Sequence, residues 1–370
     1  MKVLVAVGAT GGHIMPGMAV AEELKALDDA CEVVFAGTDR GRTRELVSRA
    51  GYSFIPVLTR GWAGVGAKGK VVFIFLMAIS LAAAFSALLR ERPHVVVGTG
   101  SYATLPFAIS ALFMDIPMVL LEQNVMPGTA TRFLSRFARE VHVAYEATIP
   151  HISKRTRAIN SGNPVRRSLL AAERNSSLKE FNLKPNLKTV LVFGGSRGAR
   201  SINSALVEAA SALSDHPDIQ FIVQTGEDDL ESVREACERA GLKAHTAPFI
   251  HEMEKAYACA DIVVCRAGAT TLAELTALGL PCILIPYPFS VGGHQEKNAM
   301  LLQGAGAAVV IRDCELTGEL LASRIVELLR DEQRMERMAE ASEALGRKDA
   351  GRAVARSVLS IGEPGRCSEG

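Results

Sequence analysis

The residues of this chain that could do chemistry lie in glycine-rich turns, each directly after a short apolar run. Residues 8–13 (GATGGH) follow the run 2–7, and residues 194–198 (GGSRG) follow the run 189–193. Glycine lets backbone N–H groups approach an anion closely, and a helix after the turn adds the positive end of its dipole. We therefore expect both turns to bind phosphate groups, although a structural tight turn would explain either one taken alone.

Two further turns strengthen this expectation. Residues 98–101 (GTGS) follow an apolar run, and residues 266–274 (RAGATTLAE) follow another and lead into a predicted helix. Glu274 lies about one turn inside that helix, where a carboxylate can accept hydrogen bonds from a ribose diol. An acidic residue near a helix start is also favoured by the helix dipole alone, so both interpretations stay open.

The first turn also contains a candidate proton acceptor. It lacks the Gly-Lys-Ser/Thr ending of a P-loop and the G-x-G-x-x-G spacing of a dinucleotide site, which disfavours ATPases and NAD-dependent dehydrogenases. His13 follows the glycines directly, and histidine titrates near neutral pH, so His13 is a candidate general base. A histidine in this place could instead cap the helix or bind phosphate.

The elements that position these turns follow from the alternation of apolar runs with helix-length segments. Continuous apolar runs separated by helices indicate parallel sheets covered on both faces, a doubly wound α/β architecture. The predicted strands are 2–7, 32–36, 95–97, 118–121, 189–193, 220–224, 262–265, 282–285 and 308–311.

Two copies of the strand–turn–helix start predict two domains. We expect them to span residues 1–164 and 165–345, with a C-terminal helix at about 346–362 that belongs to the first domain. The stretch 163–188 is polar and poorly patterned, and a linker is expected there. Amphipathic helices are expected over about 317–345 and 350–361.

Composition excludes several classes of protein. The 370 residues carry a net charge of +1, which gives no support to nucleic-acid binding. The seven cysteines contain no Cys-x-x-Cys pair, so we expect reduced thiols and no metal site. An Asp-x-Asp motif is absent as well, so no metal-bound diphosphate is expected. The first apolar run is too short for the core of a signal peptide, and no export is predicted.

One segment indicates contact with a membrane. Residues 71–89 are 19 residues without a charge, which is long enough for a spanning helix, a buried helix or a helix that docks on a lipid surface. From Arg40 to Arg92 nine residues are basic and two are acidic. Basic residues beside an apolar surface favour peripheral docking on an anionic membrane.

Seven motifs in order then resemble those of the MurG family, the UDP-N-acetylglucosamine–N-acetylmuramyl-(pentapeptide) pyrophosphoryl-undecaprenol N-acetylglucosamine transferases. The resemblance covers about residues 1–310. The motifs are GATGGHIMPGMA from Gly8, GTGSYATLP from Gly98, LLEQNVMPG from Leu120, SGNPVR from Ser161, VFGGSRGARSIN from Val192, CRAGATTLAELTALGLPCILIPYP from Cys265 and GGHQEKNA from Gly292.

The resemblance implies the GT-B fold, in which two Rossmann-like domains face a cleft. It also implies inverting transfer of N-acetylglucosamine (GlcNAc) from UDP-GlcNAc, a substrate and not a cofactor, to the 4-hydroxyl of N-acetylmuramate in lipid I, which gives lipid II. The first domain would hold the acceptor and the membrane contact, and the second would hold UDP-GlcNAc. The enzyme would act peripherally at the cytoplasmic face of the plasma membrane, with cell-wall synthesis and division proteins as further partners.

Site residues carry over onto the matching positions. Ser196 would face the diphosphate, Ile250 would contact uracil through its backbone, and Glu274 would bind the ribose. Glu122 is the rival of His13 for the role of base. The donor-binding set is Thr10, Gly11, Gly12, Asn124, Arg166, Ser196, Ile250, Ala269, Thr270, Thr271, Leu272, Ala273, Glu274 and Gln295.

The chain departs from the family pattern in the acceptor loops. Ala9 stands where many members have glycine, Thr131 stands where asparagine is common, and residues 98–102 are less rich in glycine. Architecture alone leaves a diacylglycerol glucosyltransferase and a UDP-GlcNAc 2-epimerase as alternatives, and a non-catalytic membrane adaptor as a third.

Overall fold

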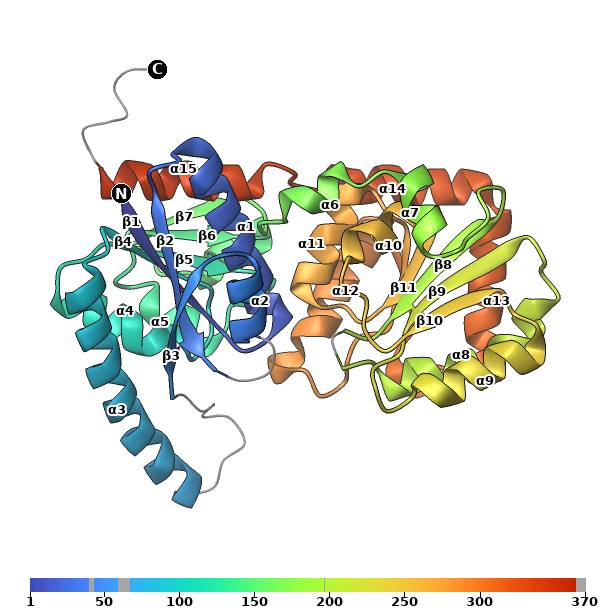
Figure 1. The fold of residues 1–370 in the computed structure, drawn as a ribbon, viewed down its shortest axis with the longest axis horizontal. Helices are drawn as coiled ribbons and strands as arrows, with labels where there is room; N and C mark the ends of the chain where they lie inside the picture. Colours follow the sequence, from blue (N-terminus) through green and yellow to red (C-terminus); the bar gives the residue numbers. More distant parts are fainter. Residues whose placement is uncertain (40–42, 59–66, 196, 364–370) are drawn as a thin grey trace. The chain divides into compact units, whose positions relative to one another are not determined.

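The computed structural model describes residues 1–39, 43–58, 67–195 and 197–363, with the backbone alone for 67–74. The chain divides into two compact units, the first formed by Met1–Arg166 together with the segment from Arg347 onward, the second by Arg167–Gly346. Each unit contains one parallel sheet with helices on both faces (Figure 1). The predicted architecture of two doubly wound α/β domains is confirmed.

The sheet of the first unit has the order β3-β2-β1-β4-β5-β6-β7, and every pairing in it is parallel. The order reverses between β1 and β4, and ligands of such sheets bind at the carboxyl ends of the strands beside this reversal. The strands are β1 (Lys2–Val7), β2 (Glu32–Thr38), β3 (Ser53–Val57), β4 (Val95–Gly98), β5 (Met118–Glu122), β6 (Glu140–Val143) and β7 (Arg157–Asn160).

Both faces of this sheet are buried, which explains why its central strands are continuously apolar. Val3, Val5 and Val7 contact one helical layer, and Leu4 and Ala6 contact the other. The first layer consists of α1 (Gly11–Leu27), α2 (Thr43–Arg49) and α15 (Ala350–Gly362), and the second of α3 (Ala67–Glu91), α4 (Thr104–Phe113) and α5 (Thr129–Leu134), with the 3-10 helix η1 (Glu146–His151) beside it.

The second unit repeats the plan with the strand order β10-β9-β8-β11-β12-β13. Its reversal lies between β8 and β11, which places the turns after these two strands side by side. The strands are β8 (Lys188–Phe193), β9 (Ile219–Gln224), β10 (Ala244–Ala247), β11 (Ile262–Cys265), β12 (Cys282–Leu284) and β13 (Ala308–Val310).

Alternate residues of β8 again contact different helical layers. Val190 and Val192 contact α8 (Arg200–Ser214), α9 (Leu230–Ala240) and α13 (Gly318–Arg330). Leu191 and Phe193 contact the opposite layer. That layer contains α6 (Arg167–Ala171), α7 (Arg174–Glu180), α10 (Met253–Cys259), α11 (Ala269–Leu278), α12 (His294–Gly304) and α14 (Glu332–Leu345), and the 3-10 helices η2 (Val291–Gly293) and η3 (Asp313–Glu315) complete the unit.

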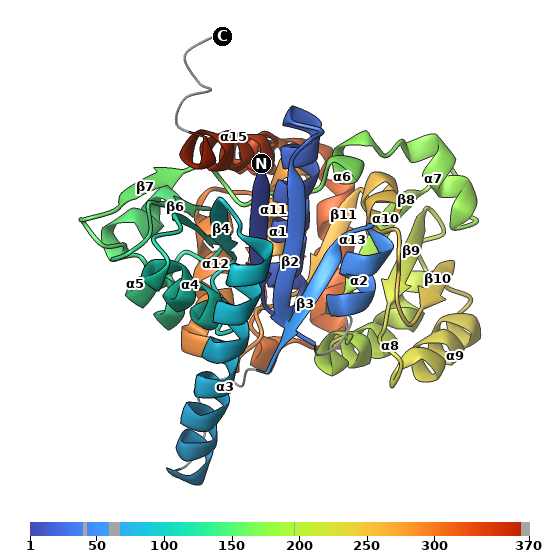
Figure 2. The same cartoon turned by 60° about the vertical axis from the view of Figure 1, so that its left-hand side comes forward.

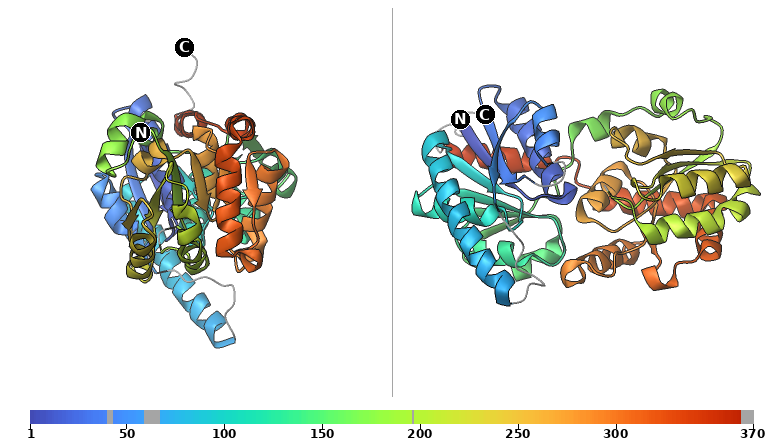
Figure 3. Two further views of the ribbon diagram at one scale, coloured as in Figure 1. Left: turned by 90° about the vertical axis from the view of Figure 1, so that its right-hand side faces the viewer. Right: turned by 60° about the horizontal axis from the view of Figure 1, so that its bottom comes forward.

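The apolar segment 71–89 forms most of α3, and over residues 75–91 this helix is half-exposed. Ser80, Ala84 and Leu88 are buried, and Ala84 and Leu88 belong to the core against the sheet. The opposite side of α3 is open to solvent, and the helix extends beyond the other elements of its unit in Figure 2 and in the left-hand view of Figure 3. Among the described residues, no helix combines the length and apolarity that crossing a membrane requires.

Three sequence-based expectations about elements need correction. Most of the stretch 163–188, expected to be a linker, folds into α6 and α7 of the second unit, where Leu178 and Phe181 are core residues. The helix expected over 317–345 is two helices, because the Asp331 side chain accepts a hydrogen bond from the Arg334 N–H and starts α14. The strands β3, β6, β7 and β10 were not predicted.

Candidate active site

The first unit brings two of the glycine turns together at the carboxyl ends of β1 and β4. A Cβ atom on Gly8 would lie 2.7 Å from Ser101 Cβ and 2.9 Å from His13 Cδ2, so only glycine permits this close packing. Thr10 is the N-cap of α1 and provides no side-chain cap to that helix. Thr10 and Gly12 are exposed and Gly11 is partly exposed, so the start of α1 is accessible to a ligand.

His13 lies at this junction with a defined orientation. Its Nδ1 is 2.7 Å from the carbonyl oxygen of Thr99, and because a carbonyl only accepts, Nδ1 carries the proton. Burial lowers the pKa of His13, while the Thr99 carbonyl, Glu122 and Gln123 oppose that shift. The ring is therefore neutral near pH 7, with the lone pair on Nε2. This is the state that a general base requires.

Glu122, at the end of β5, is buried and fully engaged in shaping the loop that follows it. Its Oε1 accepts hydrogen bonds from the backbone N–H of Asn124 at 3.1 Å and from Asn124 Nδ2 at 3.2 Å. Its Oε2 accepts a hydrogen bond from the Gly128 N–H at 3.0 Å. The carboxylate thus fixes the position of Asn124, a predicted donor-binding residue.

Buried polar atoms without hydrogen-bond partners gather around Gly100. Within the described part of the chain, Ser101 Oγ and Thr131 Oγ1 make no hydrogen bond, and Gln123 Oε1, whose side chain interacts with His13, has no partner in hydrogen-bond geometry. A Cβ atom on Gly100 would lie 3.0 Å from Thr131 Oγ1 and 3.8 Å from Gln123 Oε1. Buried polar atoms are nearly always paired, so this group indicates a place where a ligand supplies partners. Sequence reasoning did not select Gln123, although it stands between Glu122 and Asn124.

The second unit holds a corresponding turn after β8. A Cβ atom on Gly198, whose φ is +74°, would lie 1.9 Å from the Thr225 carbonyl oxygen, so the turn requires glycine there. The predicted diphosphate residue Ser196 lies outside the described residues. Gln224, buried at the end of β9, donates to the Gly195 carbonyl at 2.9 Å.

Gln224 also connects this turn to the predicted uracil site. Its Oε1 accepts a hydrogen bond from the Ile250 N–H at 2.8 Å. The Ile250 N–H is thus already engaged, so a hydrogen bond from uracil to the Ile250 backbone would have to use the carbonyl oxygen of Ile250. Sequence reasoning missed Gln224, because nothing local marks a strand-end glutamine that joins two distant loops.

The segment from Ala269 to Glu274 forms the first turns of α11. The helix starts at Gly268 without a side-chain cap, and Ala269, Thr271 and Ala273 are partly exposed. The other three members, Thr270, Leu272 and Glu274, are buried, and the Leu272 side chain belongs to the hydrophobic core. The Glu274 carboxylate accepts a hydrogen bond from Tyr257 Oη at 2.9 Å.

The other predicted residues occupy distinct places. The Gln295 side chain accepts a hydrogen bond from the Tyr287 N–H at 2.9 Å and so closes the loop before α12. Arg166 is the last residue of the first unit before the chain enters the second. Sequence reasoning missed Arg266, which pairs with Asp313 at 2.5 Å and donates to Ser201 Oγ at 2.8 Å beside the turn after β8.

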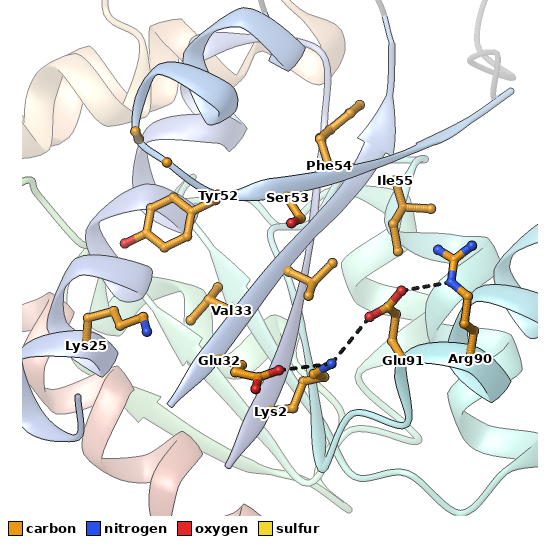
Figure 4. A pocket seen from close by; sticks show the side chains of 13 residues that line it. Lys2, Lys25, Glu32, Val33, Tyr52, Ser53, Phe54, Ile55, Arg90 and Glu91 are labelled. Carbon is orange, nitrogen blue, oxygen red and sulfur yellow. Dashed lines mark hydrogen bonds and ion pairs between the residues drawn. The ribbon is translucent and has the colours of Figure 1, made fainter. Parts of the chain in front are cut away.

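A separate cavity of about 690 Å³ lies at the amino ends of β1, β2 and β3 (Figure 4). Four of its five charged groups pair with one another: Lys2 Nζ is 3.0 Å from Glu32 Oε2 and 3.4 Å from Glu91 Oε2, and Glu91 also pairs with Arg90. The candidate site lies at the carboxyl ends, so this cavity is not part of it.

The described residues contain no group of three or more histidine, cysteine or acidic side chains that could hold a metal ion. The thiols of Cys31, Cys237, Cys259, Cys265, Cys282 and Cys314 are free.

Comparison with known proteins identifies the family of this chain and several of its relatives. The family model described as "Glycosyltransferase family 28 N-terminal domain" matches residues 3–143, and "Glycosyltransferase family 28 C-terminal domain" matches residues 189–354. A UDP-N-acetylglucosamine–N-acetylmuramyl-(pentapeptide) pyrophosphoryl-undecaprenol N-acetylglucosamine transferase of Myxococcus xanthus is 42% identical over 96% of this chain and 91% of its own length. The transferase of the same name from Geobacter sulfurreducens is 40% identical over 97% and 98%.

Similar solved structures support the same family. The crystal structure of Acinetobacter baumannii MurG superposes with a TM-score of 0.73 at 26% identity and covers 97% of this chain and 99% of that one. A UDP-GlcNAc 2-epimerase from Neisseria meningitidis has a TM-score of 0.69 at 15% identity over 97% and 100%, which is a likeness of fold alone. The chain therefore has the GT-B fold and belongs to glycosyltransferase family 28 and, within it, to the MurG family of N-acetylglucosamine transferases.

Proposed function

We propose that this enzyme transfers GlcNAc from UDP-GlcNAc to the 4-hydroxyl of N-acetylmuramate in lipid I, with inversion, to give lipid II for peptidoglycan. The observation that carries the substrate assignment is the identity of 42% over nearly the whole chain to a transferase named for this reaction. The geometry of His13 supports the chemical step.

In this mechanism His13 Nε2 takes the proton of the acceptor hydroxyl as its oxygen attacks the anomeric carbon. The bond from that carbon to the UDP diphosphate breaks on the opposite face, which inverts the configuration. His13 becomes an imidazolium, and its Nδ1–H keeps the hydrogen bond to the Thr99 carbonyl at 2.7 Å. Holding the base in place before the reaction lowers the entropic cost of the step.

His13 is the better base of the two candidates. The Glu122 carboxylate accepts three hydrogen bonds from Asn124 and Gly128, which give it a structural role in the loop after β5. Protonating it during each turnover would loosen the loop that holds Asn124. We therefore assign Glu122 to positioning and His13 to proton transfer.

The second unit is proposed to bind the UDP portion. N–H groups of the turn after β8 and of the start of α11 face the diphosphate, and preorganised donors of this kind stabilise the charge that develops on a leaving group. Glu274 binds the ribose, Ile250 the uracil, and Gln295 supports the loop that contacts the sugar. A metal is not required in this scheme.

The lipid-borne acceptor is proposed to reach the first unit from an anionic membrane surface. The solvent side of α3 displays Phe75, Ile79, Phe85 and Leu89, with Phe75 66% exposed. Arg44 and Arg49 form ion pairs with Asp39 and Glu45, which reduces their attraction for lipid, and we propose that the apolar face of α3 contacts the membrane. Arg40, Arg42 and Arg60, and the side chains of Lys68 and Lys70, lie outside the described residues.

The test is incubation with UDP-GlcNAc and a lipid I analogue in detergent or vesicles, followed by mass spectrometry. Formation of the β-linked disaccharide product supports the proposal. Transfer to diacylglycerol, or release of N-acetylmannosamine without an acceptor product, would replace it with one of the alternatives named above.

A further inference from the structure

Tyr257 joins three parts of the second unit through one buried side chain. It lies on α10 and is only 2% exposed. Its ring packs edge-to-face on Phe193, with the ring centroids 5.9 Å apart, and Phe193 is the last residue of β8 before the glycine turn. Its hydroxyl donates a hydrogen bond of 2.9 Å to Glu274 Oε2.

This contact constrains a side chain that would otherwise have several conformations. Glutamate has three rotatable side-chain bonds, and Glu274 is 7% exposed, so its carboxylate requires partners that hold its charge. The tyrosine ring cannot follow a moving carboxylate, because Phe193 and the core around α10 enclose it. Tyr257 therefore restrains the carboxylate by holding one of its two oxygens.

We propose that Tyr257 is a positioning residue for ribose recognition, which aligns the Glu274 carboxylate with the 2′,3′-diol of a uridine nucleotide. The proposal rests on the function above, in which Glu274 binds the ribose. It adds the residue that makes the site selective for ribonucleotides: a carboxylate held by Tyr257 accepts two hydroxyl hydrogen bonds in a fixed geometry, and a 2′-deoxynucleotide leaves one acceptor unpaired.

A purely structural tyrosine would behave differently. If its hydroxyl only satisfies a buried carboxylate, removing it weakens folding and changes the binding of all nucleotides equally. If it aligns Glu274, removing it weakens binding of nucleotides with an intact diol more than binding of the 2′-deoxy analogue, which keeps only the 3′-hydroxyl contact. The ratio of the two affinities separates these roles, because a general loss of stability cancels in it.

The experiment measures dissociation constants of UDP and 2′-deoxy-UDP by calorimetry for the unmodified enzyme and for Tyr257→Phe. We expect the variant to bind UDP about ten-fold more weakly, since the contact involves a charged acceptor, and 2′-deoxy-UDP with a smaller loss. The KM for UDP-GlcNAc should rise while kcat stays the same, because ribose binding is equal in ground and transition states. Tyr52→Phe, which removes a hydroxyl in the first unit, is the matched control and should change neither affinity.

Two results overturn the inference in distinguishable ways. If the unmodified enzyme binds UDP and 2′-deoxy-UDP equally well, the ribose role of Glu274 fails, and the inference fails with it. If the unmodified enzyme discriminates and Tyr257→Phe discriminates equally well, the inference alone fails.

A double variant guards against misfolding of Tyr257→Phe. Glu274→Gln and the Tyr257→Phe/Glu274→Gln double variant, which removes the charge together with the hydroxyl, should bind both nucleotides alike. If Glu274→Gln keeps some discrimination and the double variant has less, Tyr257 acts by a route other than Glu274, and the inference fails.

Discussion

Replacing His13 with glutamine tests the proposed base most directly. The substitution removes the proton acceptor but keeps a polar side chain of similar length. The backbone N–H of residue 13 still donates to the Thr10 carbonyl, at 2.9 Å in this structure, so the start of α1 stays intact. A positioned general base contributes about 100- to 10,000-fold, so we expect kcat to fall by about 1000-fold, or about 4 kcal/mol. The affinity for UDP should not change.

The pH dependence gives a second, independent signature. Burial lowers the pKa of His13 from its ordinary value of 6.5, so the imidazole stays neutral at pH 7 and turnover should be flat there. Turnover should fall as the pH drops through the lowered pKa, because the protonated ring cannot accept a proton. The unfolded chain binds this proton at a higher pH than the folded chain. The free energy of unfolding should therefore fall as the pH drops from about 6.5 through the lowered pKa of His13.

The assay follows product formation from radiolabelled UDP-GlcNAc and a soluble lipid I analogue between pH 5 and 8. The control is His151→Gln, which alters an exposed histidine of the same unit. Loss of both the rate and the acidic limb in His13→Gln supports the mechanism. Turnover close to that of the unmodified enzyme, or an unchanged acidic limb, would refute the assignment of His13 as the base.

Four other outcomes are expected. Glu122→Ala should lower the free energy of unfolding in urea by about 3 kcal/mol, because three N–H donors lose their acceptor; an inactive variant of full stability would instead indicate a chemical role for Glu122. Gln224→Leu should raise the KM for UDP-GlcNAc about ten-fold with kcat unchanged, since it breaks both bonds between the turn and Ile250. The Phe75→Ser/Phe85→Ser variant should bind anionic vesicles about 100-fold more weakly, by the apolar area lost, and keep its activity on a soluble acceptor. A chelator should leave the rate unchanged, and a rate restored only by added Mg²⁺ would contradict the metal-free scheme.

The central strands were predictable because both of their faces are buried. Runs such as Val3–Val7 are continuously apolar, a pattern that few other elements share. The four missed strands lie at or next to the edges of the sheets, and β10 (Ala244–Ala247) is only partly buried along its length. Their membership in a sheet depends on neighbours distant in sequence, which the local pattern does not reveal.

The same distinction between local and long-range contacts applies to the candidate site. The glycine turns and His13 could be predicted because consecutive residues of the sequence define a turn that requires glycine. The hydrogen bonds of Gln224 to Gly195 and of Tyr257 to Glu274 join residues 29 and 17 positions apart. These contacts exist only once the strands are in order, so residue type and spacing could not predict them.

The return of α15 to the first unit has a consequence for biosynthesis. Val354, Ala355 and Val358 complete the face of the first sheet that contains Val3 and Val5, and Gly351 lets this helix pack closely on α1. The ribosome makes that cover only after every residue of the second unit. The first unit therefore waits through the synthesis of the second with part of this apolar face uncovered, and a premature stop shortly before residue 350 would release a chain prone to aggregate.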